Sequence, residues 1–132
     1  EEWAGRKIRL SEVVDILAAV GPSIGLCCFE VDEDAADSFR NQKDHEAFLF
    51  AGNRPNKWIV DLPEANRRQM INCGIPATNI DLSHLCTSCR QDLFFSHRGS
   101  GGITGRQLNF IMVKGEAPCR VMTIGDEYPK IQ

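Results

Sequence analysis

The stretch "KWIVDLPEANRRQMINCG", residues 57–74, joins a predicted strand to a predicted helix. Its first six residues include the β-branched pair Ile59 and Val60, which is typical of a strand. Pro63 follows, and proline is favoured in the first turn of a helix because the N–H that it lacks has no partner there. Gly74 suits the end of the helix, since glycine accepts the left-handed backbone that terminates many helices. The stretch therefore predicts a strand over 57–62 and a helix that begins at Pro63.

Further elements are predicted on the N-terminal side of this unit. The apolar run "DILAAV" (15–20) ends at a Gly-Pro turn and indicates a buried strand, with a helical turn as the alternative. Asp32 can cap a helix in "EDAADSFRNQ" (33–42), whose apolar face would carry two alanines and Phe39. A strand and a helix are thus expected before residue 57.

Three segments after the unit are predicted to contain strands. They are a short strand in "ATNIDLSHL" (77–85), a buried strand in "QLNFIMVK" (107–114) and a further strand in "CRVMTIG" (119–125). Helices and strands follow one another irregularly, which predicts an α+β fold, a layered α/β domain with a mixed β-sheet. The length of 132 residues suits one domain that spans residues 1–132.

Charge and composition narrow the classes of function. The net charge of −3 gives no reason to expect nucleic acid or an anionic membrane as a partner. No window reaches the roughly 18 apolar residues of a membrane span, and the charged opening "EEWAGRKIRL" is unlike a signal peptide. Six cysteines occur in a chain that is 42% hydrophobic and so has residues enough for a core. We therefore expect reduced thiols in a cytoplasmic protein rather than three disulfides.

Two adjacent cysteines in "GPSIGLCCFEV" (21–31) need an explanation, because neighbouring cysteines rarely form a disulfide with each other. Cys28 precedes the predicted helix, whose N-terminus would favour a thiolate. A helix of about 10 residues spans only about 15 Å, so the turn after it could bring His45 back toward Cys28. A thiol beside an imidazole could act as a nucleophile with its base, or supply two zinc ligands. The alternative is a buried cysteine and an unrelated surface histidine.

A second thiol motif is the C-x-x-C sequence "CTSC", from Cys86 to Cys89. One such pair is half of a structural zinc site or a redox motif. A second C-x-x-C pair is absent, and neither Cys73 nor His84 has a characteristic spacing from this one. We therefore expect the pair to serve packing and turn formation, with structural zinc and redox chemistry as the alternatives.

The glycine-rich segment "FFSHRGSGGITGR" (94–106) is a candidate anion site. Glycines let backbone N–H groups approach an anion, and arginine can bind phosphate through two hydrogen bonds. His97, Arg98 and Arg106 are the side chains that we expect to contact substrate or phosphate. The alternative is a surface loop without a ligand.

Three stretches together are similar to successive motifs of the laccase-domain proteins. They are "AAVGPSIGLCCFEV" (18–31), "VDLPEANRRQMINCGIPATNIDLSHLCTSC" (60–89) and "DLFFSHRGSGGITGR" (92–106). That family was long labelled multicopper polyphenol oxidase and is associated with purine nucleoside phosphorylase activity. The similarity extends from about Asp15 to Val113. It implies that residues 1–132 are the C-terminal part of a larger laccase-type fold.

The resemblance also implies a site in which two histidines and a cysteine act as zinc ligands and line a nucleoside pocket. The cysteine matches Cys28, with Cys27 as its buried neighbour facing the other side, and the later histidine matches His45. The family's first histidine belongs to an H-A-G-W stretch that "EEWAGRK" does not match. We expect a preceding segment or a second chain to supply that ligand.

By the same resemblance, the expected activity is phosphorolysis of purine nucleosides (adenosine, inosine and methylthioadenosine), accompanied by adenosine deamination. Zinc is the implied cofactor, and copper is possible from the usual order of metal affinities. Two alternatives remain: a hydrolase or deamidase that uses Cys28 and His45 without a metal, and a copper-dependent polyphenol oxidase. The oxidase alternative is weak because multicopper centres need many histidines and this chain has three.

Overall fold

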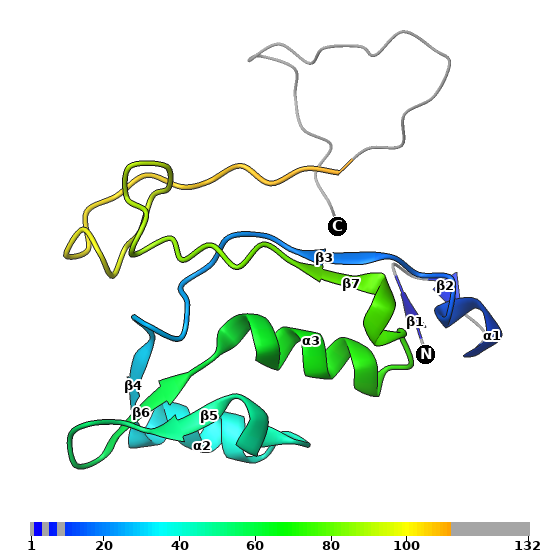
Figure 1. The fold of residues 1–132 in the computed structure, drawn as a ribbon, viewed down its shortest axis with the longest axis horizontal. Helices are drawn as coiled ribbons and strands as arrows, with labels where there is room; N and C mark the ends of the chain where they lie inside the picture. The colour runs from blue at the N-terminus through cyan, green and yellow to red at the C-terminus, as the bar shows by residue number, and fades with distance from the viewer. Residues whose placement is uncertain (1, 4–5, 8–9, 112–132) are drawn as a thin grey trace, which may run out of the picture.

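The computed structural model describes residues 2–3, 6–7 and 10–111, which form short strands and helices (Figure 1). The strands are β1 (Glu2–Trp3), β2 (Arg6–Lys7), β3 (Ala18–Val20), β4 (Glu30–Asp32), β5 (Leu49–Ala51), β6 (Lys57–Val60) and β7 (Ile80–Leu82). The helices are α1 (Leu10–Val13), α2 (Glu33–Arg40) and α3 (Leu62–Asn72), with 3-10 turns η1 (His45–Ala47) and η2 (Ala77–Asn79). The predicted α+β class is confirmed, with parallel and antiparallel strand pairs in separate sheets.

The predicted strand–helix unit is present as β6 followed by α3. The Asp61 side chain caps the helix by accepting a hydrogen bond from the Glu64 N–H at 3.2 Å. At the other end Gly74 has a φ of 101°, and the Ile75 N–H bonds to the Met70 carbonyl at 3.1 Å. This is a Schellman ending, and it requires the positive φ that glycine tolerates. Local sequence signals therefore set both ends of α3.

An antiparallel sheet of order β4-β6-β5 holds the main apolar cluster. Val31 of β4 lies opposite Trp58 of β6, and helix α2 packs on the sheet through Ala36. The buried members of the cluster come from β4, α2, the η1–β5 segment, β6 and α3: Val31, Ala36, Phe48, Leu49, Val60 and Ala65. The core of the described residues thus lies between positions 31 and 65, with Val13 and Ile75 buried outside this cluster.

A separate parallel pair, β3 beside β7, aligns Ala18 with Ile80 and Val20 with Leu82. The pairing continues as an isolated parallel bridge between Ser23 and Cys86. Helix α3 contacts β3 and, elsewhere along its length, η1, so it lies between the parallel pair and the antiparallel sheet (Figure 1). Because paired parallel strands run in the same direction, the segments that follow β3 and β7 leave from the same end of the pair.

Some predicted elements differ from the structure. The segment 15–20 was expected to be a buried strand, but β3 covers only 18–20 and its Ala19 is exposed. Residues 107–111 form no strand, and the large side chains there, Leu108, Phe110 and Ile111, are exposed. These apolar residues have no neighbouring strand among the described residues against which to pack. The predicted strand at 119–125 lies outside the described residues. Among the described helices, none is long and apolar enough to cross a membrane.

Phe48→Ala is expected to lower the free energy of unfolding by about 3–5 kcal/mol. The side chain is completely buried, and its ring packs edge-on against Phe39 with the ring centres 6.4 Å apart. Urea unfolding measures the loss, and Phe50→Ala is the matched control because Phe50 is 41% exposed in the adjoining strand. Equal losses in the two variants would contradict this placement of the core.

Candidate functional site

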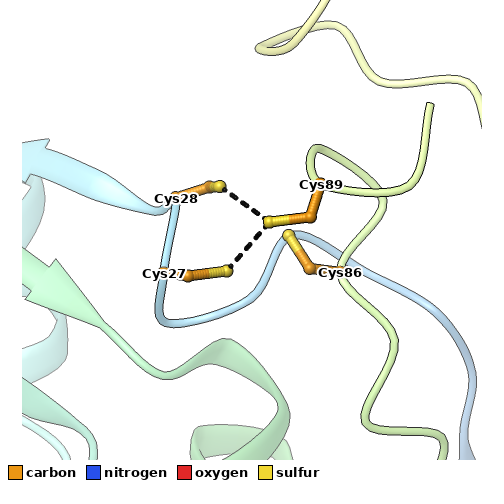
Figure 2. Close-up of side chains that lie close together, drawn as sticks. All are labelled: Cys27, Cys28, Cys86 and Cys89. Carbon is orange, nitrogen blue, oxygen red and sulfur yellow. Dashed lines mark hydrogen bonds between the residues drawn. The ribbon is translucent and has the colours of Figure 1, made fainter.

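Four cysteine side chains from two distant segments converge on one point (Figure 2). Cys27 and Cys28 belong to the loop before β4, and Cys86 and Cys89 belong to the segment after β7. All four sulfur atoms lie within 4.8 Å of one another. Cys27 and Cys89 are exposed, whereas Cys28 and Cys86 are half-buried. Among the described residues, these four cysteines lie close enough together to bind one metal ion.

The parallel strand pair explains why these segments meet. The Ser23–Cys86 bridge and the hydrogen bond from the Thr87 N–H to the Ser23 carbonyl (3.0 Å) extend the β3–β7 pairing to the cysteines. The Gly25 N–H then donates to the Cys86 sulfur at 3.2 Å. Ligand sites in parallel sheets commonly form beyond the carboxyl ends of the strands, and this cluster occupies such a place.

The sulfur–sulfur contacts centre on Cys89. Its sulfur lies 3.3 Å from that of Cys27 and 3.5 Å from that of Cys28. In Figure 2 the side chains of each pair point toward the other segment, and the Cys89 sulfur faces both Cys27 and Cys28. The five cysteines of the described residues are free thiols.

The local surroundings shift the pKa values of the Cys86 and Cys27 thiols in opposite directions. Burial opposes ionisation of Cys86, but the backbone N–H groups of Gly25, Cys89 and Ser88 outweigh it and lower the pKa of this thiol to about 6. The contact with Cys89, followed by burial, raises the pKa of Cys27 to about 12. Near neutral pH the cluster therefore carries a thiolate at Cys86 and a protonated thiol at Cys27.

Two expectations about the cysteines are wrong. "CTSC" does have a partner pair, because the adjacent Cys27 and Cys28 supply the other two thiols. Cys27 is also not a buried neighbour facing away, since it is exposed and its sulfur contacts Cys89 as Cys28 does. One sequence feature could have indicated this cluster: each pair of cysteines follows a predicted strand, and parallel pairing of the two strands would bring the cysteines together. Spacing rules for C-x-x-C motifs do not capture an adjacent pair.

His45 lies at the start of η1, shortly after helix α2. Its side chain is 41% exposed, and Nδ1 lies 3.7 Å from a carboxylate oxygen of Glu46. Strand β4 stands between Cys28 and α2, so Cys28 does not directly precede the helix N-terminus as expected. The pairing of Cys28 with His45 stays a prediction.

From the sequence, His84 was set aside because its spacing from "CTSC" is not characteristic of a metal site. It has a left-handed backbone, with φ of 54°, which is uncommon outside glycine. Its side chain lines a hollow of about 310 Å³ together with Cys27 and Cys86. The imidazole therefore lies on the same surface as the cysteine cluster.

The candidate anion-binding residues are divided between two hollows. His97 and Arg106 line the same hollow, of about 550 Å³, within the glycine-rich segment. Arg98 lines a different hollow, beside Glu30, Asp32 and other residues of β4 and α2. There its guanidinium donates to the Glu30 carbonyl at 2.9 Å. His97 and Arg106 thus line one hollow, and Arg98 lines another.

Comparison with known proteins supports the motif-based resemblance. Residues 6–114 match the family described as multi-copper polyphenol oxidoreductase laccase. Over 98 residues the chain is 46% identical to purine nucleoside phosphorylase YlmD of Geobacillus stearothermophilus, covering 74% of this chain and 36% of that protein. It is 40% identical over 105 residues to human purine nucleoside phosphorylase LACC1 (76% and 24%), and 36% identical over 100 residues to adenosine deaminase RL5 of an unknown prokaryote (75% and 38%).

Solved structures agree with these relatives. The crystal structure of YlmD from Geobacillus stearothermophilus superposes with a TM-score of 0.61 at 42% identity, covering 66% of this chain and 33% of that one. The crystal structure of the Bacillus licheniformis hypothetical protein YfiH gives 0.60 at 37% identity, covering 64% and 32%. The chain therefore spans about a third of the length of these structures. It belongs to the multi-copper polyphenol oxidoreductase laccase family, as part of that family's fold.

Proposed function

We propose that this chain forms part of an enzyme that phosphorolyses purine nucleosides and also deaminates adenosine. The observation that carries the proposal is the 46% identity over 98 residues to a protein named purine nucleoside phosphorylase. The similarity to a protein named adenosine deaminase supports the second activity. Because the chain spans 24–38% of these relatives, the remainder of the active site would come from outside the 132 residues.

Phosphorolysis requires an anion held in line with the sugar. A phosphate oxygen forms a bond to C1′ while the bond from C1′ to the purine nitrogen breaks, through an oxocarbenium-like state. Arg106 and His97 suit the phosphate, because they line one hollow and can donate several hydrogen bonds to it. Arg98 suits it less well, since carboxylates of Glu30 and Asp32 share its hollow and would repel an anion.

Zinc fits the chemistry of the proposed donors. The half-buried Cys28 thiol and the accessible His45 imidazole are a sulfur and a nitrogen ligand of the kinds that zinc accepts. A histidine from a preceding segment or a second chain would complete the usual three ligands of a catalytic site. When bound, zinc would lower the pKa of a water molecule toward about 7.

Deamination needs a water molecule directed at the purine carbon that bears the amino group. A bond forms from the water oxygen to that carbon, and the carbon–nitrogen bond then breaks to release ammonia. The proton that the water gives up passes to the departing amino group, and the proposed role of Cys28 and His45 is to hold the zinc ion that would polarise this water. Cys28 and His45 are thus the residues to which we assign the chemistry.

The test of this function is phosphate-dependent release of hypoxanthine from inosine, measured by chromatography. The polypeptide used is residues 1–132 preceded by the corresponding N-terminal segment of Geobacillus YlmD. Release that requires phosphate supports the proposal, and adenosine conversion to inosine tests the second activity. A folded, zinc-loaded protein that releases no base would overturn it.

Arg106→Ala is expected to raise the KM for phosphate by about 10-fold or more, because a hydrogen bond to a charged group contributes roughly 1.5–3 kcal/mol. The same extended polypeptide is used, with phosphate varied at saturating inosine. Arg90→Ala is the matched control. Arg90 does not line the His97 hollow, and its guanidinium is paired with the Asp92 carboxylate at 2.8 Å. A KM for phosphate that is unchanged in Arg106→Ala would remove this residue from the phosphate site.

A further inference from the structure

The sequence "CTSC", residues 86–89, forms one turn of the chain that the proposed function does not use. The Arg90 N–H bonds to the Cys86 carbonyl at 3.0 Å and closes this turn. Residues three apart in a helical turn lie on the same side, so Cys86 and Cys89 are neighbours. Their sulfurs lie within 4.8 Å of each other, and both side chains point toward the loop of Cys27 and Cys28 (Figure 2). Rotation of the two side chains would bring the sulfurs within reach of a disulfide bond.

Cys86 has the surroundings of a reactive thiol. The Gly25 N–H donates to its sulfur at 3.2 Å from the opposite segment. Burial opposes ionisation of Cys86, but this N–H and those of Cys89 and Ser88 lower the pKa of the thiol. The thiolate is the form of cysteine that attacks an oxidant. Cys86 also lines the hollow of about 310 Å³ beside His84, which gives a small molecule access to the sulfur.

We propose that Cys86 and Cys89 are a peroxide-reactive thiol pair that forms a reversible disulfide. The Cys86 thiolate attacks one oxygen of hydrogen peroxide, the O–O bond breaks, and hydroxide leaves, so that Cys86 becomes a sulfenic acid. The Cys89 sulfur then attacks the Cys86 sulfur, the S–O bond breaks, and a second hydroxide leaves as the S–S bond forms. The two thiol protons and the two hydroxides make two water molecules. Two electrons therefore pass from the thiol pair to the peroxide.

Cys89 is the partner of Cys86 because the two residues share one turn. The short connection holds their sulfurs together independently of the distance between the two segments. Cys27 is the competing thiol, since its sulfur lies 3.3 Å from that of Cys89. Cys27 belongs to the other segment, however, so a bond to it would depend on both segments keeping their places.

The proposal goes beyond the proposed enzymatic function and leaves the residues of that function unchanged. The Cys89 sulfur lies 3.5 Å from the Cys28 sulfur, so in the reduced chain these two thiols are also within reach of each other. Once Cys89 is bonded to Cys86, neither thiol of the C-x-x-C pair remains to form a disulfide with Cys28. Cys28 therefore stays a free thiol, available as the proposed zinc ligand.

The experiment treats the reduced 132-residue chain with hydrogen peroxide, alkylates the remaining thiols, and maps them by mass spectrometry after trypsin digestion. Cys73, Cys86 and Cys89 belong to the tryptic peptide 69–90, whereas Cys27 and Cys28 belong to the peptide 10–40. We expect the loss of two of the six thiols, both from peptide 69–90, which becomes two hydrogens lighter and keeps one alkylated cysteine. Peptide 10–40 should keep two alkylated cysteines. Dithiothreitol should restore both lost thiols.

Serine variants identify the pair. Cys86→Ser and Cys89→Ser should each abolish the disulfide of peptide 69–90, because serine cannot form an S–S bond. Cys73→Ser is the matched control on the same peptide, and Cys27→Ser removes the competing thiol, so both should form the disulfide to the same extent as the unaltered chain. Cys89 is exposed, so serine at this position is compatible with folding, which circular dichroism can verify.

Three results would overturn the proposal. They are a disulfide that joins peptide 10–40 to peptide 69–90, oxidation of the cysteines to sulfinic acid without a disulfide, and no loss of thiols on treatment with peroxide. Each result is read from the thiols of the 132-residue chain. It is therefore distinct from a failure of the extended polypeptide to release purine base.

Discussion

Cys28→Ala is expected to lower phosphate-dependent release of purine base by more than about 100-fold in the polypeptide extended with the N-terminal segment of YlmD. In the proposed site Cys28 is a direct zinc ligand, and alanine offers no donor atom in its place. Loss of an outer-shell partner alone commonly costs 10–100-fold, so loss of the ligand itself should cost more. The measurement is kcat/KM for inosine at saturating phosphate, with bound zinc quantified in the same samples.

Cys73→Ala is the matched control for this prediction. Cys73 is a half-buried free cysteine at the C-terminal end of α3, outside the four-thiol cluster. We expect its turnover to stay within about 2-fold of the unaltered protein, since its replacement removes no proposed ligand. If Cys27→Ala abolished turnover while Cys28→Ala spared it, the proposed functional thiol would be the wrong one of the two.

A polypeptide of residues 1–132 alone is expected to show little or no phosphorolysis, and extension by the histidine-bearing segment should raise turnover by more than about 100-fold. Cys28 and His45 would supply two ligands, whereas a catalytic zinc normally takes three protein ligands and keeps one position open. The chain also spans only 36% of YlmD, so much of a nucleoside pocket would be absent. Release of hypoxanthine from inosine is compared at equal protein concentrations.

The control for the extension is the same chimera with its added histidine replaced by alanine. It should behave like the 132-residue chain while keeping the fold of the longer protein. Comparable turnover by the short chain and the extended one would contradict the prediction. It would mean that a third ligand lies within the 132 residues, and His97 and His84 would then be the histidines to replace.

Local sequence signals predicted the elements that local interactions stabilise. The β6–α3 unit follows from Ile59 and Val60 in the strand, proline in the first helical turn and Gly74 at the end. Helix α2 was predicted over 33–42 and runs from Glu33 to Arg40; Asp32 occupies the N-cap position as expected, but its side chain makes no capping hydrogen bond and pairs with Lys57 instead. Each of these signals acts within about one turn of the chain, so the sequence alone carries it.

Strand predictions failed where burial depended on distant neighbours. An apolar run such as 107–111 resembles a buried strand, but a strand needs a partner for its backbone and a surface for its side chains. Among the described residues nothing covers Leu108 or Phe110, and both stay exposed. An apolar composition indicates that a segment can be buried, but it does not identify the strand or helix that would cover it.

The sequence by itself determined the family, through three ordered motifs, and named Cys28 and His45 as candidates on the strength of that resemblance. Only the tertiary structure decided that Cys27, Cys28, Cys86 and Cys89 share one site. The physical reason is that strands β3 and β7 pair in parallel although about 60 residues separate them. Each cysteine pair follows a predicted strand, but that local signal does not say which strands pair. The pairing depends on hydrogen bonds that form only once the intervening chain has folded.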